Sequence, residues 1–349
     1  MEAVIVLLPG DGIGPEVIAG ARQVLEVVAE KYQHNFEFRE ELMGGAAIDA
    51  IGEPLPAATI ASCEDSDAVL LGAVGGPKWS DPAAPVRPEQ GLLGLRSALG
   101  VYANLRPVEV YDELAGASPL RPELLKNVDM LVVRELTGGI YFGEKTRDED
   151  SASDLCVYHT HEIERIVRFA ARLATARRKQ LCSVDKANIL ETSRLWRATT
   201  DRLMAAEFAN VEVETLLVDA AAMHLLSRPG DFDVIVTENM FGDILTDEAS
   251  MLAGSLGMLP SASLGDSARG LYEPIHGSAP DIAGKGIANP SALILAAGLM
   301  LDHIGEGAKG DRIRAALAAT IRDGRTTTPD LGGNASTLEF ADAVLERLG

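Results

Sequence analysis

The stretch Thr237–Ala253 reads TENMFGDILTDEASMLA and directly follows a largely apolar run, Phe232–Val236, that is typical of a strand. It places Asp243 and Asp247 four residues apart, so a helix would carry both carboxylates on one side. Two like charges in this arrangement destabilise a helix unless a cation lies between them. Because such oxygen ligands suit Mg²⁺ or Mn²⁺, the stretch predicts a strand that leads into a metal-binding helix. A pair of solvated aspartates is the alternative.

The rest of the chain repeats this alternation of strands and helices. Helical patterns alternate with short β-rich runs over most of the 349 residues, of which 47% are apolar. This pattern predicts an α/β protein of one to three domains whose sheets are covered by helices. The formal net charge of −21 repels nucleic acid and anionic membranes, so we expect neither as a partner. An anionic substrate would need local arginines or a metal ion to overcome this charge.

Three further features bear on the compartment. Cys63, Cys156 and Cys182 are widely spaced and form no C-x-x-C motif, which indicates a reducing compartment and no structural zinc site. The N-terminal sequence MEAVIVLLPGDG lacks a basic region, so we expect a strand there and not a signal peptide. The longest apolar run, Ala292–Leu301, is far shorter than the roughly 20 residues that span a bilayer. Together these features predict a cytoplasmic protein.

The hydrophobic periodicity predicts the individual elements. We expect helices at Glu16–Tyr32, Gly91–Leu99, His161–Arg178, Ile189–Phe208, Ser291–Ile304, Asp311–Arg322 and Thr337–Leu348. We expect strands at Ala3–Leu8, Phe36–Glu40, Ala68–Val74, Asn104–Tyr111, Met130–Leu136, Gly139–Gly143, Leu155–His159, Leu181–Asp185 and Val211–Val218. The strands on either side of the charged tip Arg147–Asp154 predict a projecting hairpin, whose apolar residues would need cover from a second subunit. The segment Gly75–Pro88 is rich in glycine and proline, which predicts a long functional loop.

The first turn of the chain invites comparison with a dinucleotide-binding motif. The sequence GDGIGP at Gly10–Pro15 follows an expected strand and opens an expected helix. The G-x-G-x-x-G fingerprint requires a glycine where Pro15 stands, and no acidic residue occupies a clear strand end about 20 residues later. We therefore predict a tight turn with proline entering the helix, and no conventional Rossmann site.

Three arginines lie at the edges of apolar segments. Arg96 ends LLGLR, Arg106 lies in ANLRP and Arg134 lies in LVVRE. Each alone would be typical of a surface ion pair. Three within 39 residues of a very acidic protein favour a clamp for carboxylates, which guanidinium groups bind through two parallel hydrogen bonds.

Two further charged residues follow expected strands. Lys186, in VDKAN, lies where ligands bind in α/β sheets, so it is either a base near other cations or a solvated lysine at a helix entry. Asp219 follows Val218 and offers a third carboxylate beside Asp243 and Asp247.

A glycine-punctuated segment runs from His276 to Asn289 and reads HGSAPDIAGKGIAN. Its small residues allow close approach of a ligand to the backbone, and Asp281 could accept hydrogen bonds from ribose hydroxyls. A purely structural loop is the alternative.

Taken in order along the chain, these segments resemble the isocitrate/isopropylmalate dehydrogenase family of β-hydroxyacid oxidative decarboxylases. The resemblance covers nearly the whole chain, and its most specific blocks are GDGIGPE, LLGLR with ANLRP, VRELTGGIYFGE, VDKAN, TENMFGDILTDEAS and HGSAPDIAG. It implies a two-domain, non-Rossmann α/β fold with a β-hairpin dimer arm. Residues 1–101 and 254–349 would form a cofactor-binding domain. Residues 102–253 would form a domain for substrate, metal and dimerisation, with the arm at 141–160.

The resemblance also implies a homodimer with shared active sites and a role for each site residue. Arg96, Arg106 and Arg134 would bind the carboxylates of an alkylmalate. Asp243 and Asp247 would hold Mg²⁺ or Mn²⁺ together with Asp219 of the partner subunit, which would also border the substrate. Lys186, also from the partner, would accept the hydroxyl proton as hydride leaves for NAD⁺, and Tyr141 would protonate the enolate after CO₂ departs. The implied cofactor contacts are Gly76, Glu89, His276, Gly277, Ser278, Ala279, Pro280, Asp281 and Asn289, with the loop 75–89 approaching the nicotinamide half.

The choice of substrate and cofactor can be argued from two places. Leu92 and Leu93 precede Arg96 by one helical turn, so a carboxylate-binding group would border an apolar patch suited to a branched alkyl group. This patch agrees with the substrate that the resemblance implies, 3-isopropylmalate in leucine biosynthesis. Asp281 would repel the 2′-phosphate of NADP, which favours NAD.

Other functions remain open at the level of sequence. A metal-dependent lyase or phosphoryl-transfer enzyme could use the same aspartates, although no GK[ST] motif occurs. A non-catalytic regulatory subunit or an RNA-binding protein would not need the whole Arg, Lys, Tyr and Asp set. A sister enzyme could act on isocitrate, homoisocitrate, tartrate or methylmalate.

Overall fold

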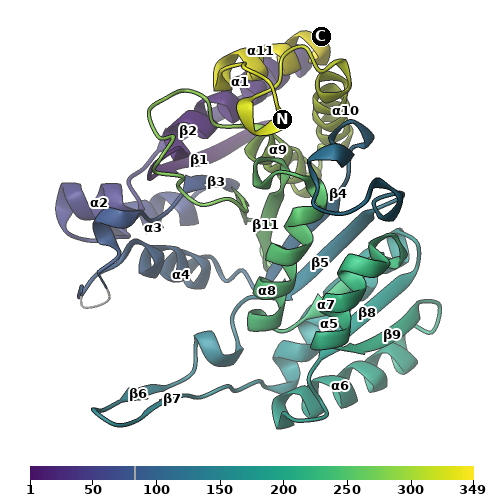
Figure 1. The fold of residues 1–349 in the computed structure, drawn as a ribbon. Coiled ribbons are helices and arrows are strands. Elements are labelled where there is room, and N and C mark those ends of the chain that lie inside the picture. Colours follow the sequence, from purple (N-terminus) through teal and green to yellow (C-terminus); the bar gives the residue numbers. More distant parts are fainter. Residues whose placement is uncertain (82–83) are drawn as a thin grey trace. The chain divides into compact units, whose positions relative to one another are not determined.

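The computed structural model describes residues 1–81 and 84–349. The chain divides into two compact units, which we call unit 1 (residues 1–101 and 255–349) and unit 2 (residues 102–254). Both ends of the chain belong to unit 1, and a single internal stretch forms unit 2 (Figure 1). That unit 1 binds the cofactor and unit 2 the substrate and metal remains a proposal.

The sheet of unit 1 is built from runs of apolar residues. Its strands are β1 (Glu2–Gly10), β2 (Asn35–Glu40), β3 (Ala68–Ala73), β11 (Pro260–Leu264) and β12 (Gly270–Pro274). They lie in the order β2-β1-β3-β12-β11, and only the pairing of β11 with β12 is antiparallel. Every residue of β3 is buried, as expected where helices cover both faces of a sheet.

Seven helices of unit 1 pack around this sheet within the described part of the chain. They are α1 (Gly14–Tyr32), α2 (Gly44–Ile51), α3 (Ala57–Glu64), α4 (Pro88–Leu99), α9 (Ser291–His303), α10 (Gly307–Asp323) and α11 (Thr337–Leu348). Helix α9 is buried over most of its surface because it packs on β11 and β12 and against α1 and α10. Its composition explains this position, since SALILAAGLMLDH is apolar on every face.

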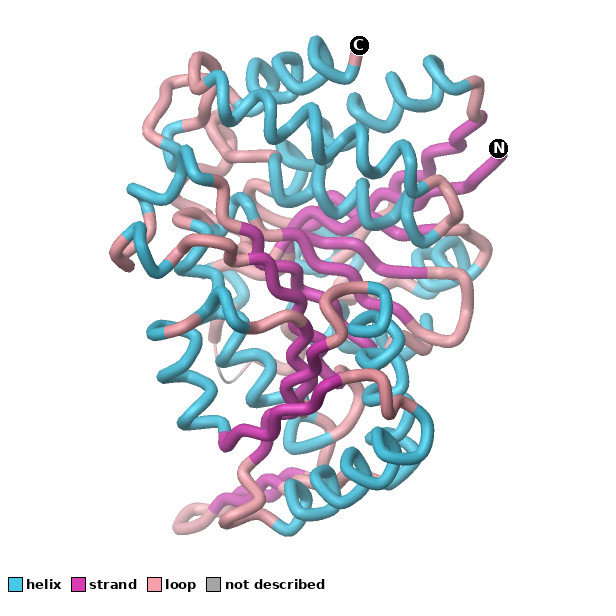
Figure 2. Tube along the Cα trace, turned by 90° about the vertical axis from the view of Figure 1, so that its right-hand side faces the viewer, coloured by secondary structure: helices cyan, strands magenta, loops and turns pink. Residues whose placement is uncertain are grey.

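Within unit 2, five strands pair side by side, and one of these pairs is antiparallel. The strands β4 (Ala103–Glu109), β5 (Asp129–Glu135), β8 (Gln180–Asp185), β9 (Glu212–Leu217) and β10 (Val234–Thr237) lie in the order β4-β5-β10-β8-β9. Only β4 is antiparallel to its neighbour in this part of the sheet. The helices are α5 (Thr160–Ala176), α6 (Glu191–Glu207), α7 (Val218–Ser227) and α8 (Asn239–Ser250). In each unit the strands run between helices (Figure 2).

The hairpin of unit 2 differs from the sequence-based expectation in its bounds. Its strands are β6 (Lys145–Arg147) and β7 (Ala152–Asp154), so β7 lies within the segment expected to be the charged tip and β6 overlaps that segment at Arg147 (Figure 1). The strand expected at Gly139–Gly143 is wrong, because Gly139 has a left-handed φ of 78° and begins a 3₁₀ turn, Gly139–Tyr141. The strand expected at Leu155–His159 is also absent from the described structure.

Several elements had no clear signal in the sequence. Helices α2 and α3 have only eight residues each, too few to establish a 3.6-residue period. Strand β11 reads PSASL and lacks the β-branched residues that mark strands. Helix α7 begins at Val218, directly after β9. The sequence pattern predicts Val218 at the end of the strand, because no turn residue separates the two elements.

Candidate active site

The segment Thr237–Ala253 forms the junction that the sequence predicts. Strand β10 ends at Thr237 and helix α8 begins at Asn239. Glu238 caps the helix, because its carboxylate accepts hydrogen bonds from Met240 N at 3.2 Å and Phe241 N at 2.9 Å. Burial raises the pKa of Glu238 above its usual range. The junction therefore fixes where α8 leaves the sheet.

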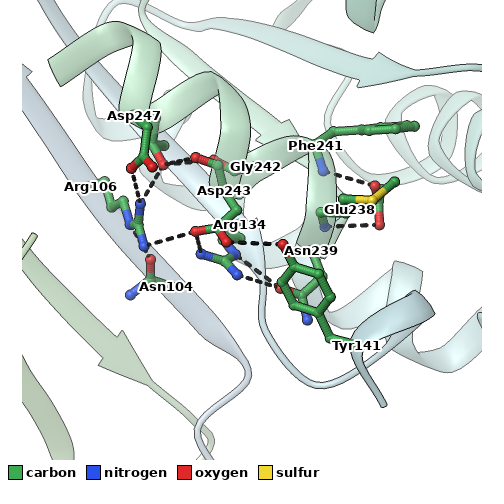
Figure 3. Close-up of polar contacts among 12 residues, drawn as sticks. Asn104, Arg106, Arg134, Tyr141, Glu238, Asn239, Phe241, Gly242, Asp243 and Asp247 are labelled. Atoms are coloured by element: carbon green, nitrogen blue, oxygen red, sulfur yellow. Dashed lines mark hydrogen bonds and ion pairs between the residues drawn. The ribbon is translucent and has the colours of Figure 1, made fainter. Parts of the chain in front are cut away.

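Unit 2 brings five of the expected site residues together: Arg106, Arg134, Tyr141, Asp243 and Asp247. We call these five residues the acid–arginine cluster (Figure 3). Arg134 Nη1 donates to Asp243 Oδ1, and Arg106 Nη2 lies 3.5 Å from the same oxygen. Arg106 Nη1 lies 3.7 Å from Asp247 Oδ1, and Tyr141 donates its hydroxyl to Asp243 Oδ2 at 3.0 Å.

The arginines of the cluster are held by buried neighbours. Arg106 on β4 is 8% exposed and donates from Nε to Asn104 Oδ1 at 2.9 Å. Arg134 on β5 is 3% exposed and lies directly under α8. A Cβ at position 242 would lie 2.7 Å from Arg134 Cγ, so Gly242 makes room for this side chain. Two buried cations are costly unless carboxylates and hydrogen-bond acceptors surround them, which this arrangement supplies.

Burial and negative charge act together on the tyrosine of the cluster. Burial, followed by the charge and the hydrogen bond of Asp243, raises the pKa of the Tyr141 hydroxyl above its usual range. Tyr141 therefore keeps its proton at neutral pH and can serve as a proton donor.

Lys186 and Asp219 form a separate pair in the same unit. Lys186 directly follows β8, Asp219 lies in the first turn of α7, and Lys186 Nζ lies 2.6 Å from Asp219 Oδ1. This hydrogen bond lowers the pKa of the Asp219 carboxyl.

Arg96 has a partner that the sequence did not reveal. It lies on α4 in unit 1, and its Nη2 donates to Glu273 Oε1 on β12 at 2.6 Å. Both side chains are almost buried. Leu92 is half-buried and Leu93 is exposed on the same helix.

Unit 1 contains a largely apolar cavity of about 510 Å³ beside the glycine-punctuated loop. Four of the expected cofactor contacts line it: His276, Gly277, Ala279 and Asn289. The other expected contacts, Gly76, Glu89, Ser278, Pro280 and Asp281, are not among its lining residues. Burial lowers the pKa of the His276 imidazole, so this wall of the cavity is neutral at pH 7.

The cavity has further walls that the sequence did not point to. Ile13, Leu256 and Asp330 all line it, and Asp330 Oδ2 accepts from Asn289 Nδ2 at 2.9 Å. Asp330 lies in TTTPDL, a segment with no recognisable motif of its own. Its contacts with Asn289, 41 residues away, and with Ser255 Oγ at 2.6 Å connect it to other residues of the cavity wall.

Asp11 in the first turn of the chain connects this turn to two other segments of unit 1. Its buried carboxylate accepts from Gly45 N and Ala46 N in the first turn of α2 at 2.8 Å, and from Gly75 N at 2.7 Å. A protein carboxylate thus occupies a helix N-terminus of the kind that binds phosphate elsewhere. The same contacts fix the start of the loop 75–89, of which Pro82 and Ala83 lie outside the described residues.

Comparison with known proteins identifies the family. The isocitrate/isopropylmalate dehydrogenase family matches residues 4–344. The 3-isopropylmalate dehydrogenase of Rhodopirellula baltica is 56% identical, over 100% of this chain and 99% of the relative. That of Anaeromyxobacter dehalogenans is 57% identical over 100% of both chains. The chain belongs to the isocitrate/isopropylmalate dehydrogenase family. The predicted family and its mixed α/β fold are therefore confirmed.

A solved member of the isocitrate/isopropylmalate dehydrogenase family has the same fold. The crystal structure of isocitrate dehydrogenase from Methylococcus capsulatus has a TM-score of 0.87, covers 99% of both chains and is 37% identical. No helix in the described part of our chain has the length and apolar character needed to cross a membrane.

The isocitrate/isopropylmalate dehydrogenase family implies a divalent cation. The carboxylate oxygens of the acid–arginine cluster are ligands of the kind that such a cation prefers. Asp243 and Asp247 lie on one face of α8, and their side chains are 35% and 71% exposed, so both can reach a cation. Across residues 1–81 and 84–349, no three His, Cys, Asp or Glu side chains of one chain gather as a metal site. One chain thus offers two carboxylates, and further oxygen ligands must come from water, substrate or another subunit.

Proposed function

We propose that this chain catalyses the NAD-dependent oxidative decarboxylation of (2R,3S)-3-isopropylmalate to 4-methyl-2-oxopentanoate and CO₂ in leucine biosynthesis. The observation that carries the proposal is the acid–arginine cluster, which combines two buried guanidinium groups with two carboxylates on α8. Full-length relatives named 3-isopropylmalate dehydrogenase, 56% and 57% identical to this chain, support the choice of substrate.

The substrate is a dianion, so its binding begins with the arginines. Arg106 and Arg134 bind its carboxylates from unit 2, and Arg96 contributes from α4 by exchanging Glu273 for substrate. Guanidinium groups bind a carboxylate by two directed hydrogen bonds, which also orient the carbon that reacts. Leu92 and Leu93 supply the apolar contact for the isopropyl group. One methylene in such a contact is worth about 1–3 kcal/mol, so we expect modest discrimination against shorter alkylmalates.

Asp243 and Asp247, with Asp219 of a second copy, hold Mg²⁺ or Mn²⁺. The cavity beside His276 holds the adenosine half of NAD, with Asp281 disfavouring NADP. When bound, the cation and the cofactor supply an electrophile for the C2 oxygen and an acceptor for hydride.

Two side chains of the protein move protons in this reaction. Lys186 of a second copy accepts the hydroxyl proton of the substrate as the neutral amine, which requires Asp219 to leave its 2.6 Å ion pair with Lys186 for the cation. Tyr141 delivers a proton to the enolate carbon after CO₂ leaves. Its hydroxyl already lies in the cluster, 3.0 Å from Asp243 Oδ2.

A homodimer completes the site. Met223 on α7 and Ile244 on α8 are 63% and 59% exposed, and Leu226 is exposed one turn after Met223. Large apolar side chains gathered on two neighbouring helices favour burial against another protein surface. A second copy would bury them and bring its own Lys186 and Asp219 to the cluster.

A spectrophotometric panel tests the proposal. The protein is mixed with Mg²⁺, NAD⁺ or NADP⁺ and each of 3-isopropylmalate, isocitrate, homoisocitrate, tartrate and methylmalate, and the absorbance of the reduced nicotinamide is followed. We expect the highest kcat/KM with 3-isopropylmalate and NAD⁺. The likeness to a solved isocitrate dehydrogenase makes isocitrate the main alternative, and turnover of isocitrate without turnover of 3-isopropylmalate would overturn the proposal.

A further inference from the structure

We propose that Asn239 is a positioning residue that holds Arg134 and the turn carrying Tyr141 in one fixed arrangement. Asn239 is the first residue of α8 and is fully buried, with 0% of its surface exposed. A group without exposed surface does not touch the substrate, so its effect passes through its neighbours. The inference rests on the proposed function, because it assigns Asn239 to the same reaction.

The amide of Asn239 makes contacts at both of its ends. Its Oδ1 accepts from Arg134 Nε at 3.0 Å and from Arg134 Nη2 at 2.8 Å (Figure 3). Its Nδ2 donates to the carbonyl oxygen of Gly138 at 3.2 Å. A guanidinium only donates and a carbonyl only accepts, so these partners allow one orientation of the amide and exclude the flipped one.

The two partners of the Asn239 amide, Arg134 and Gly138, connect it to Asp243 and to Tyr141. Arg134 extends from β5 and donates from Nη1 to Asp243 Oδ1. Gly138 precedes the 3₁₀ turn Gly139–Tyr141, and the hydroxyl of Tyr141 reaches Asp243 Oδ2 at 3.0 Å. The contacts therefore close a ring from Asn239 through Arg134, Asp243, Tyr141 and Gly138 back to Asn239. A shift at one member must move the others.

The backbone of Asn239 is fixed as firmly as its side chain. Its N–H donates to the hydroxyl of Tyr158 at 3.0 Å, and that hydroxyl lies 3.2 Å from Glu238 Oε2. A Cβ at position 138 would lie 2.6 Å from the Tyr158 ring, so Gly138 is held close to the same tyrosine. Because both its backbone N–H and its side-chain amide are held by hydrogen bonds, Asn239 sets the distance between Arg134, which binds substrate, and Tyr141, which donates the proton.

The first arm of the test measures the position of Arg134 without any substrate. In ¹H–¹⁵N NMR spectra, the Arg134 Nε–H should give a resolved signal that exchanges slowly with water, because it is buried and bonded to Asn239 Oδ1. Asn239→Ala should abolish this protection. Asn239→Asp keeps the acceptor for Arg134, adds a negative charge beside the guanidinium and replaces the donor to Gly138 by a second acceptor, so it should retain the Arg134 signal.

The second arm measures catalysis. We expect Asn239→Ala to lower kcat/KM for 3-isopropylmalate about 30-fold in the native protein, since misplacing a reacting group by about 1 Å costs on the order of 100-fold. In an Arg134→Lys background, which cannot form the forked contact, the same substitution should cost less than about threefold. Asn239→Asp should lower kcat, because it frees the turn that carries Tyr141. Thr320→Val in unit 1, which removes a buried hydroxyl bonded to Ala316 O, should lower the melting temperature without changing kcat/KM.

The outcomes separate the inference from the proposed function. Equal losses of kcat/KM in the native and Arg134→Lys backgrounds would show a general structural effect and overturn the positioning role. A protected Arg134 signal in Asn239→Ala would do the same. If Asn239→Ala does not fold, an undiminished kcat in Asn239→Asp is the result that refutes the link to Tyr141. A wild-type protein that oxidises no alkylmalate would refute the proposed function. The NMR measurement would still show whether Asn239 holds Arg134.

Discussion

The hydroxyl of Tyr141 donates to Asp243 Oδ2 at 3.0 Å, while the other oxygen of that carboxylate accepts from Arg134. One carboxylate thus joins Tyr141, the proposed proton donor, to Arg134, the proposed substrate-binding arginine. It lies on α8, one turn before Asp247, so the same helix also presents the second acidic side chain of the cluster. The site therefore depends on how α8 leaves the sheet of unit 2, which Glu238 and Asn239 determine.

Tyr141→Phe tests the proton-donor role. We expect kcat to fall about 100-fold with little change in KM, because the hydroxyl acts after the substrate has bound. Single-turnover kinetics should show that protonation of the enolate, after CO₂ has left, has become the slow step. Tyr111→Phe, on a tyrosine that precedes the 3₁₀ turn Asp112–Ala117, is the matched control. Equal losses of kcat in the two variants would contradict the role of Tyr141.

Asp243→Asn and Asp247→Asn test the metal site. Each keeps the size of the side chain and removes one negative charge, so the Mg²⁺ concentration for half-maximal activity should rise about tenfold or more. Asp247→Asn should act mainly on metal affinity, because its one ion pair in the cluster is the 3.7 Å contact with Arg106 Nη1. Asp243→Asn should also change KM for the substrate, because Arg106 and Arg134 lose their shared carboxylate. An unchanged Mg²⁺ titration in both variants would remove these residues from the metal site.

The local sequence was sufficient to predict the framework of unit 2. The spacing of Asp243 and Asp247 indicated one helix face, and α8 carries both. The apolar segments around Arg106 and Arg134 indicated strands, and β4 and β5 place these arginines beside Asp243. These predictions succeeded because strand and helix periods are local properties of the chain.

Contacts between distant parts of the chain could not be predicted in the same way. Glu273 meets Arg96 across 177 residues, and nothing in the sequence around Glu273 marks it as a partner. Asp330 reaches the cavity through Asn289, and Asn239 reaches Arg134 across 105 residues. Such pairs depend on tertiary packing, which leaves no periodic trace in a single sequence. The hairpin bounds were wrong for a related reason, because the left-handed Gly139 ends the extended backbone early.

Asp281→Arg tests the preference for NAD. Asp281 is exposed in the loop beside the cavity, so its charge can act on a bound nucleotide. The substitution replaces a charge that repels the 2′-phosphate of NADP by one that attracts it. The ratio of kcat/KM with NAD to kcat/KM with NADP should therefore fall about tenfold or more, which corresponds to roughly 1.4 kcal/mol. Asp281→Asn should give a smaller change of the same sign. A ratio that neither variant alters would remove Asp281 from the cofactor site.

His303 makes the stability of unit 1 depend on pH. Its Nδ1 lies 2.6 Å from the Tyr272 hydroxyl, and burial lowers the pKa of the imidazole below its usual value of 6.5. The unfolded chain then binds the proton more readily than the folded one. The stability from neutral His303 is therefore complete above pH 6.5 and is lost as the pH falls through the lower, folded pKa.

His303→Gln should accordingly flatten this dependence. Between pH 7.5 and pH 5, the melting temperature of the wild type should fall further than that of the variant. His161→Gln, at an exposed position, is the control and should follow the wild type. Parallel curves for all three proteins would show that His303 does not titrate in this way.

Met223→Glu tests the dimer and the sharing of the site. Met223 is 63% exposed on α7, next to α8 with its exposed Ile244. A charge placed in an apolar interface is costly to bury, so light scattering should show the mass of the particle halved. The kcat should fall at least about tenfold in parallel, because a monomer lacks the partner's Lys186 and Asp219. Ile51→Glu, on an exposed apolar residue of α2 in unit 1, should change neither mass nor kcat. A monomeric Met223→Glu protein with full activity would show that each chain carries a complete site.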